Sequence, residues 1–296
     1  METLEALQAR IDTARDLKSV VRTMKSLAAA SIRQYEHAVS SLRRYSETVR
    51  LGFQIALRDN PRPPPADDGD GPVGAIVIGS DHGLCGRFNE QIVRFAKSSL
   101  AEEEAPASNG GVLWLALGAR VASRLEAEGE HLDANLIQPS TVSKLASTVY
   151  SLLLHIDEWQ RTRQPRRLLV FHNSRLGSST AAPRRVQVLP LDSAWLDGLA
   201  TRRWQGRTRP MFTMDPAALF AALARQHLFV TLYRATAESL ASEHASRLVA
   251  MQTAEKNIEE HLTETTAAYR RKRQEAITSE LLEIVAGFEA SSSRQG

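Results

Sequence analysis

The sequence lacks several features that would mark whole classes of protein. Its 296 residues include one cysteine, Cys85, so an internal disulfide is excluded and a reducing compartment is expected. No apolar run approaches the roughly 20 residues that a membrane-spanning helix needs. The first residues follow neither a signal-peptide pattern nor the acid-poor composition of a transit peptide. Aromatic residues make up only 6%, which is low for a chain whose bulk is a packed globule. A cytoplasmic product of a bacterial-type cell fits these absences.

A strong excess of charge of one sign is also missing. The chain has 37 basic and 34 acidic residues, a net charge of +3, and the two signs are mixed along the sequence. Proteins that bind nucleic acid usually concentrate a larger basic excess on one face. We therefore expect no nucleic-acid partner.

Helix breakers are nearly absent from both ends of the chain. All 12 prolines lie between Pro61 and Pro216, and of the 16 glycines only Gly52, Gly287 and Gly296 fall outside that interval. Proline costs a helix interior about 3 kcal/mol and glycine about 1 kcal/mol. The chain therefore divides into two helical ends and a middle segment rich in turns.

The N-terminal segment, residues 1–58, repeats small or apolar residues in steps of three and four, as a coiled-coil seam does. At 1.5 Å per residue, a helix of this length would extend roughly 85 Å. Lys18 and Ser31 interrupt the seam. Its members are Leu4, Leu7, Ile11, Ala14, Val21, Met24, Ala28, Tyr35, Ala38, Leu42, Tyr45 and Val49.

The C-terminal segment, residues 213–290, predicts a second long helix. Asp215 is a suitable N-cap and Pro216 suits the first helical position. The helix should run on the order of 100 Å and end at Gly287 before a polar tail, 291–296. Its seam reads Leu240, Leu248, Met251, Ala254, Ile258, Leu262, Tyr269, Ile277, Leu281, Ile284 and Phe288. Because a helix this long outruns any globule of this size, we expect the two ends to pair as an intramolecular antiparallel coiled coil.

The middle segment predicts an α/β domain over residues 73–212, after a stiff acidic linker at 59–72. Strands are expected at 73–79, 111–118, 166–174 and 184–191, and helices at 90–100, 119–128 and 143–161. Alternating strands and helices indicate a mainly parallel sheet covered on both faces. The last two strands are too close in sequence for a helical crossover, so that pair should be antiparallel.

Candidate catalytic motifs are weak. GDGPVG at 69–74 matches a dinucleotide-binding string but precedes a strand, whereas the functional motif follows one. The turn 79–86 is better placed for phosphate but lacks the ending of a P-loop. Asp81, His82 and Cys85 are too few for a metal site without a second cluster. We therefore expect no catalytic, cofactor-binding or metal-binding residue; His172 and Ser174 likewise lack a third triad member.

Three stretches of the sequence resemble one family. Residues 10–31, RIDTARDLKSVVRTMKSLAAAS, are similar to the family's RI…T…I…AMKMVAAS pattern, and SDHGLCGRFN at 80–89 looks like its SDRGLCGGLN. Near the C-terminus, residues 238–257 and 269–287 follow the family signature almost throughout. The family is the gamma subunit of F-type ATP synthases and related rotary ATPases, and the resemblance spans essentially the whole chain.

The resemblance implies an antiparallel coiled coil plus a nucleotide-fold-like α/β domain that binds no nucleotide. It implies a non-catalytic rotor subunit of the central stalk, which couples ion translocation to ATP synthesis or hydrolysis. The implied partners are the alpha and beta subunits of a catalytic hexamer, an epsilon-type subunit and a membrane ring of ion-carrying subunits. The implied location is peripheral, at the cytoplasmic face of the bacterial inner membrane.

The resemblance also implies contact residues. Six positions match those that touch the loops of surrounding catalytic subunits, and long cations among them suit acidic loops. From periodicity alone, each charged member could equally be part of a solvated helix face. The six are Met24, Lys25, Arg273, Gln274, Thr278 and Glu280.

Departures from the family pattern leave alternatives open. His82 stands for a usual arginine, Arg87 for a usual glycine, and Arg270 where asparagine is common. They indicate a divergent branch, for which the sodium-linked rotary ATPase of some bacteria is a candidate. Two other functions remain: a nucleotide-binding α/β enzyme with helical dimerisation arms, and a coiled-coil scaffold that does not rotate.

Overall fold

The computed structural model describes residues 3–58, 71–103, 111–176, 180–204, 208 and 210–292. Most of the expected linker (59–72), part of the GDGPVG string and most of the polar tail lie outside this range. Two compact units are recognised, and each is described by itself. Unit 1 comprises Met1–Leu27 with Leu248–Gly296, and unit 2 comprises Ala28–Arg247.

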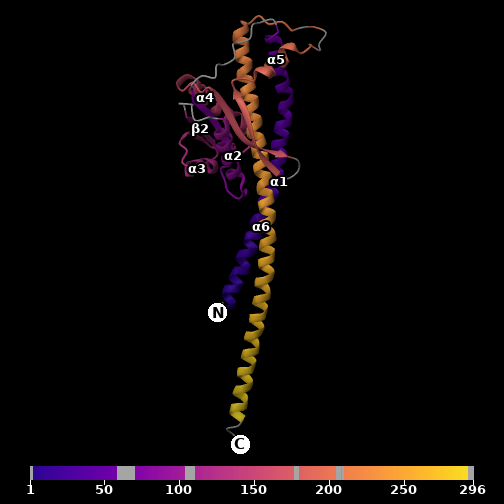
Figure 1. Ribbon diagram of the computed structural model, residues 1–296. Helices are drawn as coiled ribbons and strands as arrows, with labels where there is room; N and C mark the ends of the chain where they lie inside the picture. Colours follow the sequence, from indigo (N-terminus) through magenta and orange to yellow (C-terminus); the bar gives the residue numbers. More distant parts are fainter. Residues whose placement is uncertain are drawn as a thin grey trace. The chain divides into compact units, whose positions relative to one another are not determined.

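Two long helices supply segments to both units. Helix α1 covers Leu4–Ala56 and helix α6 covers Pro216–Ser292, as the absence of breakers predicted (Figure 1). Asp215 caps α6, because its carboxylate accepts a hydrogen bond from the Ala218 amide at 3.0 Å. The expected end at Gly287 is wrong, since α6 continues to Ser292. One glycine costs a helix only about 1 kcal/mol and does not stop it.

In unit 1 the two helices run antiparallel. Lys18 of α1 pairs with Glu259 of α6, and Lys25 pairs with Glu255, so numbers fall on one helix as they rise on the other. Leu7, Ile11 and Met251 are buried on this seam. The coiled-coil prediction is therefore confirmed here.

The predicted seam is wrong at its C-terminal end. Ile277, Leu281 and Ile284 are 48%, 56% and 69% exposed. The register that sets Lys18 opposite Glu259 places the start of α1 at Leu4 opposite about residue 273. Helix α6 continues well beyond that level, so its apolar positions there have no facing turn of α1 to pack against.

Unit 2 contains a five-stranded sheet in the order β3-β2-β1-β4-β5. Strands β1, β2, β3 and β4 are mutually parallel where they pair, and β4 pairs with β5 in antiparallel fashion, as expected. Their bounds are β1 Val73–Ile78, β2 Val112–Leu117, β3 Leu132–Leu136, β4 Arg167–Leu176 and β5 Thr180–Leu189. The fold-class prediction is confirmed.

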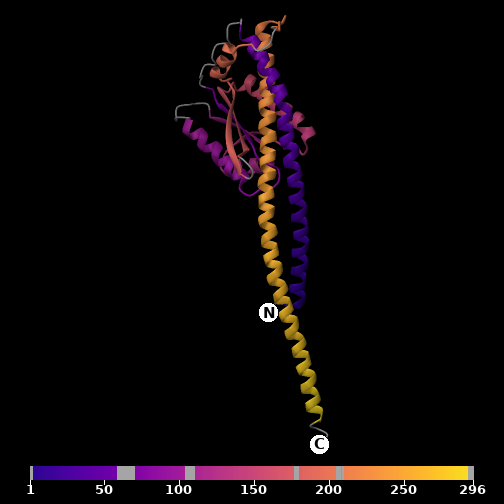
Figure 2. The ribbon, with the colours of Figure 1, turned by 90° about the vertical axis from the view of Figure 1, so that its right-hand side faces the viewer.

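Helices cover both faces of the sheet. Helices α2 (Phe88–Glu103) and α3 (Ala119–Ala127) pack on one face, and α4 (Leu145–Thr162) packs with α6 on the other. Figure 2 shows the strands between α2, in purple, and the orange α6. The residues that alternate along β1 separate accordingly: Ile76 and Ile78 face α4 and α6, and Ala75 and Val77 face α2 and α3.

Two elements of unit 2 were not expected. Strand β3 has the sequence LDANL, whose Asp and Asn are poor strand formers, and it lies at the edge of the sheet. Helix α5, Ser193–Thr201, contains Gly198 and begins at an Asp192 cap. It packs against the end of α1, where Trp195 contacts Phe53 edge to face at 5.4 Å between ring centroids. The remaining element is a short 3₁₀ turn, η1, at Val142–Lys144.

In unit 2 α1 and α6 are again antiparallel neighbours. Tyr35 stacks on His244 at 5.6 Å, and further along Phe53 meets Phe220 at 5.5 Å. Ala28, Ala38 and Val49 of the predicted seam are buried. Tyr45 is 43% exposed, so its prediction as a seam residue is wrong; its hydroxyl donates to the Gln226 side-chain oxygen at 2.5 Å instead.

Candidate functional site

The turn after β1, residues 79–86, contains the strongest candidates for catalytic or ligand-binding residues in the sequence. The Asp81 carboxylate accepts hydrogen bonds from the backbone amides of Ala119 and Gln138, at 2.9 and 3.0 Å. It therefore links the segments that follow β1, β2 and β3. Cys85 is buried, and burial raises the pKa of its thiol, which keeps it protonated at neutral pH. These contacts give the turn a structural role, since they connect it to the neighbouring segments of the domain.

The topological switch point of the sheet lies between β1 and β4. In doubly wound sheets, ligands bind in the crevice at the carboxyl ends of such strands. Here α6 occupies that place: the Ser239 hydroxyl, fully buried, donates to the carbonyl of Ile78 at 3.3 Å. His172 of β4 lies 3.2 Å from a Glu238 carboxylate oxygen. The sheet thus holds a helix where an enzyme of this fold would hold a nucleotide.

Beside this contact lies a buried ion pair within α6. Glu243, 4% exposed, accepts from Arg247 at 2.6 Å, and Arg247 also donates to the carbonyl of Gly83 at 3.4 Å. Burial raises the pKa of Glu243 and lowers that of His244 to about 4. The pair fastens the turn to α6 at a position shielded from solvent.

The six predicted contact residues all lie in unit 1, but not together. Met24 is half-buried on α1, and Lys25 beside it is bonded across to Glu255. The other four stand on α6 beginning 18 residues after Glu255, about 27 Å along the helix. They form two groups at two levels of the paired helices.

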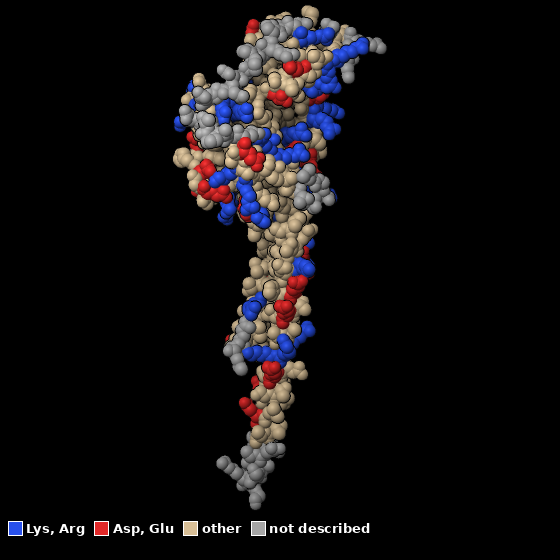
Figure 3. All heavy atoms as spheres, viewed as in Figure 1, with Lys and Arg blue, Asp and Glu red and all other residues tan. Residues whose placement is uncertain are grey.

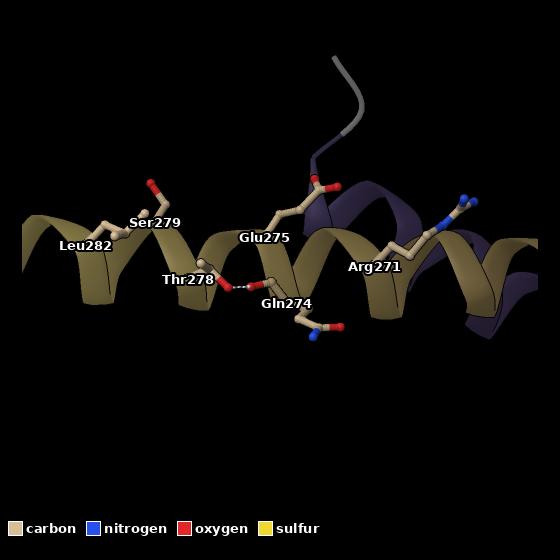
Figure 4. Close-up of a pocket in the computed structure, with 6 residues that line it drawn as sticks. All are labelled: Arg271, Gln274, Glu275, Thr278, Ser279 and Leu282. Carbon is tan, nitrogen blue, oxygen red and sulfur yellow. Dashed lines mark hydrogen bonds between the residues drawn. The ribbon is translucent and has the colours of Figure 1, made fainter.

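The second group is exposed. Arg273, Gln274, Thr278 and Glu280 all have accessible side chains. The Thr278 hydroxyl donates to the Gln274 carbonyl at 2.8 Å, within α6. Figure 4 shows Gln274 and Thr278 on one side of the helix, while Glu275 and Ser279 point to the opposite side. Gln274 and Thr278, both predicted contact residues, help to line a shallow depression. Its other lining residues are Arg271, Glu275, Ser279 and Leu282.

Sequence reasoning missed the acidic partners of the first group. Glu255 and Glu259 accept from Arg22, Lys25 and Lys18 of α1. The signal was present: the three cations recur at steps of four and three, and the two acids are four apart. Which cation meets which carboxylate depends on the register of the two helices, and the sequence alone does not give that register.

Comparison with known proteins decides the family. The model of the ATP synthase family matches residues 3–290, which is nearly the whole chain. The chain belongs to the ATP synthase family. The resemblance to the gamma subunit is thereby confirmed, and the chain is a rotor subunit of the central stalk. The family match does not favour a nucleotide-binding enzyme.

Solved structures share the fold at low sequence identity. A rotor chain of the Euglena gracilis mitochondrial ATP synthase is 17% identical with a TM-score of 0.64, covering 93% of this chain and 98% of that one. A chain from the OSCP/F1/c-ring structure of the same enzyme is 18% identical with a TM-score of 0.68, covering 99% and 96%. A chain from the central stalk and c-ring of the Tetrahymena thermophila mitochondrial ATP synthase is 18% identical with a TM-score of 0.55, covering 79% of this chain and 99% of that one.

In the described part of the chain, no helix combines the length and apolar character needed to cross a membrane. Within the same residues, no three His, Cys, Asp or Glu side chains gather to hold a metal ion.

Proposed function

We propose that this rotor subunit works as a non-catalytic mechanical shaft. Its paired helices stand within a hexamer of alpha and beta subunits, and its α/β domain sits on a membrane ring beside an epsilon-type subunit. It is a peripheral subunit at the cytoplasmic face of the bacterial inner membrane. The observation that carries the proposal is the occupation of the sheet's ligand crevice by α6, with Ser239 bonded to Ile78. The sheet serves to hold a helix.

Coupling follows from asymmetry. One shaft facing three equivalent catalytic sites makes different contacts with each, and so holds them in different conformations. Rotation then carries each site through binding, reaction and release. The six residues Met24, Lys25, Arg273, Gln274, Thr278 and Glu280 are the proposed contacts with catalytic-subunit loops. Exposure of the last four supports this assignment, since they are accessible to a partner.

Rotation can be tested directly on the assembled complex. Ile137 is 78% exposed and offers a place for a label, whereas native Cys85 is buried and should resist modification. The chain carrying Ile137→Cys is co-expressed with the hexamer subunits, biotinylated and attached to a bead while the hexamer is fixed to a surface. We expect the bead to turn in one direction when ATP is added. The unsubstituted chain is the control and should acquire no bead.

A stationary bead on a complex that hydrolyses ATP would contradict the shaft proposal. The enzyme alternative has its own measurement, which is nucleotide titration of the isolated chain. We expect no saturable binding at micromolar nucleotide, because α6 occupies the crevice. Saturable binding at that concentration would favour the enzyme instead.

A further inference from the structure

Five charged side chains form one network between the two helices of unit 1. Lys18 lies 2.7 Å from Glu259, and Arg22 and Lys25 lie 2.8 and 2.5 Å from the two carboxylate oxygens of Glu255. Arg22 also approaches Glu259 at 3.8 Å. Lys18, which interrupts the apolar seam in the sequence, therefore belongs to a network of ion pairs that joins the two helices.

Glu255 is the centre of this network. Its two oxygens accept from two different cations, one from Arg22 and one from Lys25. Its side chain is only 13% exposed, compared with 48% for Glu259. The hydrogen bond from Lys25, followed by that from Arg22, lowers the pKa of Glu255 to about 2, so the carboxylate is ionised at neutral pH.

The bridge leaves Lys25 able to meet a partner. Its side chain remains 35% exposed, and an ammonium has three N–H donors, of which Glu255 uses one. The network contains three cations and two carboxylates, so one positive charge is left over. Figure 3 shows acidic and basic side chains interspersed along this part of the helices. An acidic group is the partner that such a site would accept.

We propose that Glu255 is a positioning residue, which holds the Lys25 ammonium against α6 so that Lys25 and Met24 are presented together to an acidic loop of the surrounding hexamer. This inference rests on the proposed function. A lysine on a free surface samples many rotamers, and ordering it on binding costs affinity. The bridge orders it in advance.

Glu259 provides a matched control. It is acidic, lies one helical turn from Glu255 on α6, and bonds to α1, but it contacts Lys18 and Arg22 and not Lys25. Glu255→Gln and Glu259→Gln thus remove the same charge from the same helix. Only the first releases Lys25.

The experiment has a part on the isolated chain and a part on the complex. In the isolated chain, the carboxyl pKa of Glu255 is measured by NMR, and amide hydrogen exchange over residues 18–27 reports pairing of the helices. In the complex, the apparent dissociation constant of the chain for the purified alpha–beta hexamer is measured. The variants are E255Q, E259Q and the charge swap K25E with E255K, in which position 25 still faces an opposite charge on α6.

We expect E255Q to weaken hexamer binding about two- to fivefold, the range of a partly exposed ion pair, and E259Q to leave it unchanged. The charge swap should regain only part of the exchange protection of residues 18–27, because position 25 again faces an opposite charge but Arg22 loses its acceptor on Glu255. The affinity should not return, since position 25 then presents a carboxylate. This readout separates positioning from simple stabilisation of the coiled coil.

Three results would overturn the inference. A Glu255 pKa near 4.5 would show that the bridge does not form. Equal affinities of E255Q and wild type, or equal losses in E255Q and E259Q, would deny a role specific to Lys25. Full recovery of affinity in the charge swap would reduce Glu255 to a stabilising residue. Failure of the wild-type chain to bind the hexamer would instead contradict the proposed function itself, and the pKa measurement does not depend on it.

Discussion

Units 1 and 2 hold the same two helices by different means. In unit 2, α6 is buried by a sheet: Leu232, Ala237 and Ser239 are at zero exposure. Ser239 bonds to the end of β1, and Arg247 bonds to the turn that follows it. In unit 1, Leu7, Ile11 and Met251 are buried, while the described flanks of the seam carry half-exposed ion pairs. Burial fixes a helix strongly, whereas exposed charge fixes it weakly but leaves surface for partners.

The largest effect is expected from the buried ion pair of unit 2. Arg247→Met leaves the Glu243 carboxylate buried without its cation, and loss of one partner of such a pair costs about 3–5 kcal/mol. The measurement is urea unfolding of the full chain followed by tryptophan fluorescence. All four tryptophans lie in the range of unit 2, so the signal reports that unit.

The matched double variant, Glu243→Leu with Arg247→Met, should recover most of this loss, because apolar groups of similar size can replace a buried pair. A loss below about 1 kcal/mol in Arg247→Met would mean that the Glu243 carboxyl is already neutral in the folded chain.

The next largest effect is expected from the difference in burial between leucines of α6 in the two units. Leu232 is fully buried against the sheet, so Leu232→Ala should lower the free energy of unfolding by about 2–5 kcal/mol. Leu281, at 56% exposure on the other end of α6, is the control, and Leu281→Ala should change stability by less than about 0.5 kcal/mol. Comparable losses at both sites, measured by hydrogen exchange across α6, would erase the difference between the units.

Acid should weaken unit 2 through His244. Its pKa is lowered from 6.5 to about 4 by burial and then by Arg247. Between these values the unfolded chain binds a proton that the folded chain does not, so stability is complete above about pH 6.5 and falls as the pH drops toward 4. The loss should be on the order of 3 kcal/mol.

The check is the difference in stability between wild type and His244→Gln across that pH range. The raised pKa of Glu243 has the opposite effect, because it makes the folded state more stable as the pH falls. This effect is the same in wild type and in His244→Gln, so it cancels in the difference. A difference that does not vary with pH would show that His244 is not shielded.

The smallest effect belongs to unit 1. Lys18 is bonded to a Glu259 that is 48% exposed, and exposed pairs contribute about 0–1 kcal/mol. Lys18→Ala should therefore speed hydrogen exchange of residues 7–27 only a few-fold, and less at high salt, because salt screens the pair. A large, salt-independent increase would mean that Lys18 acts through packing.

Much of the fold was open to prediction because its signals are local. Proline and glycine counts located both long helices, Asp215-Pro216 marked the start of α6, and apolar runs located β1, β2 and β4. Strand β3 escaped because LDANL has weak strand propensity and becomes a strand only by pairing with β2. The exposure of Leu281 escaped because a repeating apolar pattern on one helix does not say where its partner begins.

The sequence by itself determined that this protein has two long helices around an α/β segment, and its motifs identified the family. The tertiary structure decided which charges meet and what fills the sheet's crevice. Glu255 lies 230 positions from Lys25, and Ser239 lies 161 positions from Ile78. Such partners depend on register and closure of the whole chain, which local propensity does not encode, and they carry both the proposed shaft and its positioned lysine.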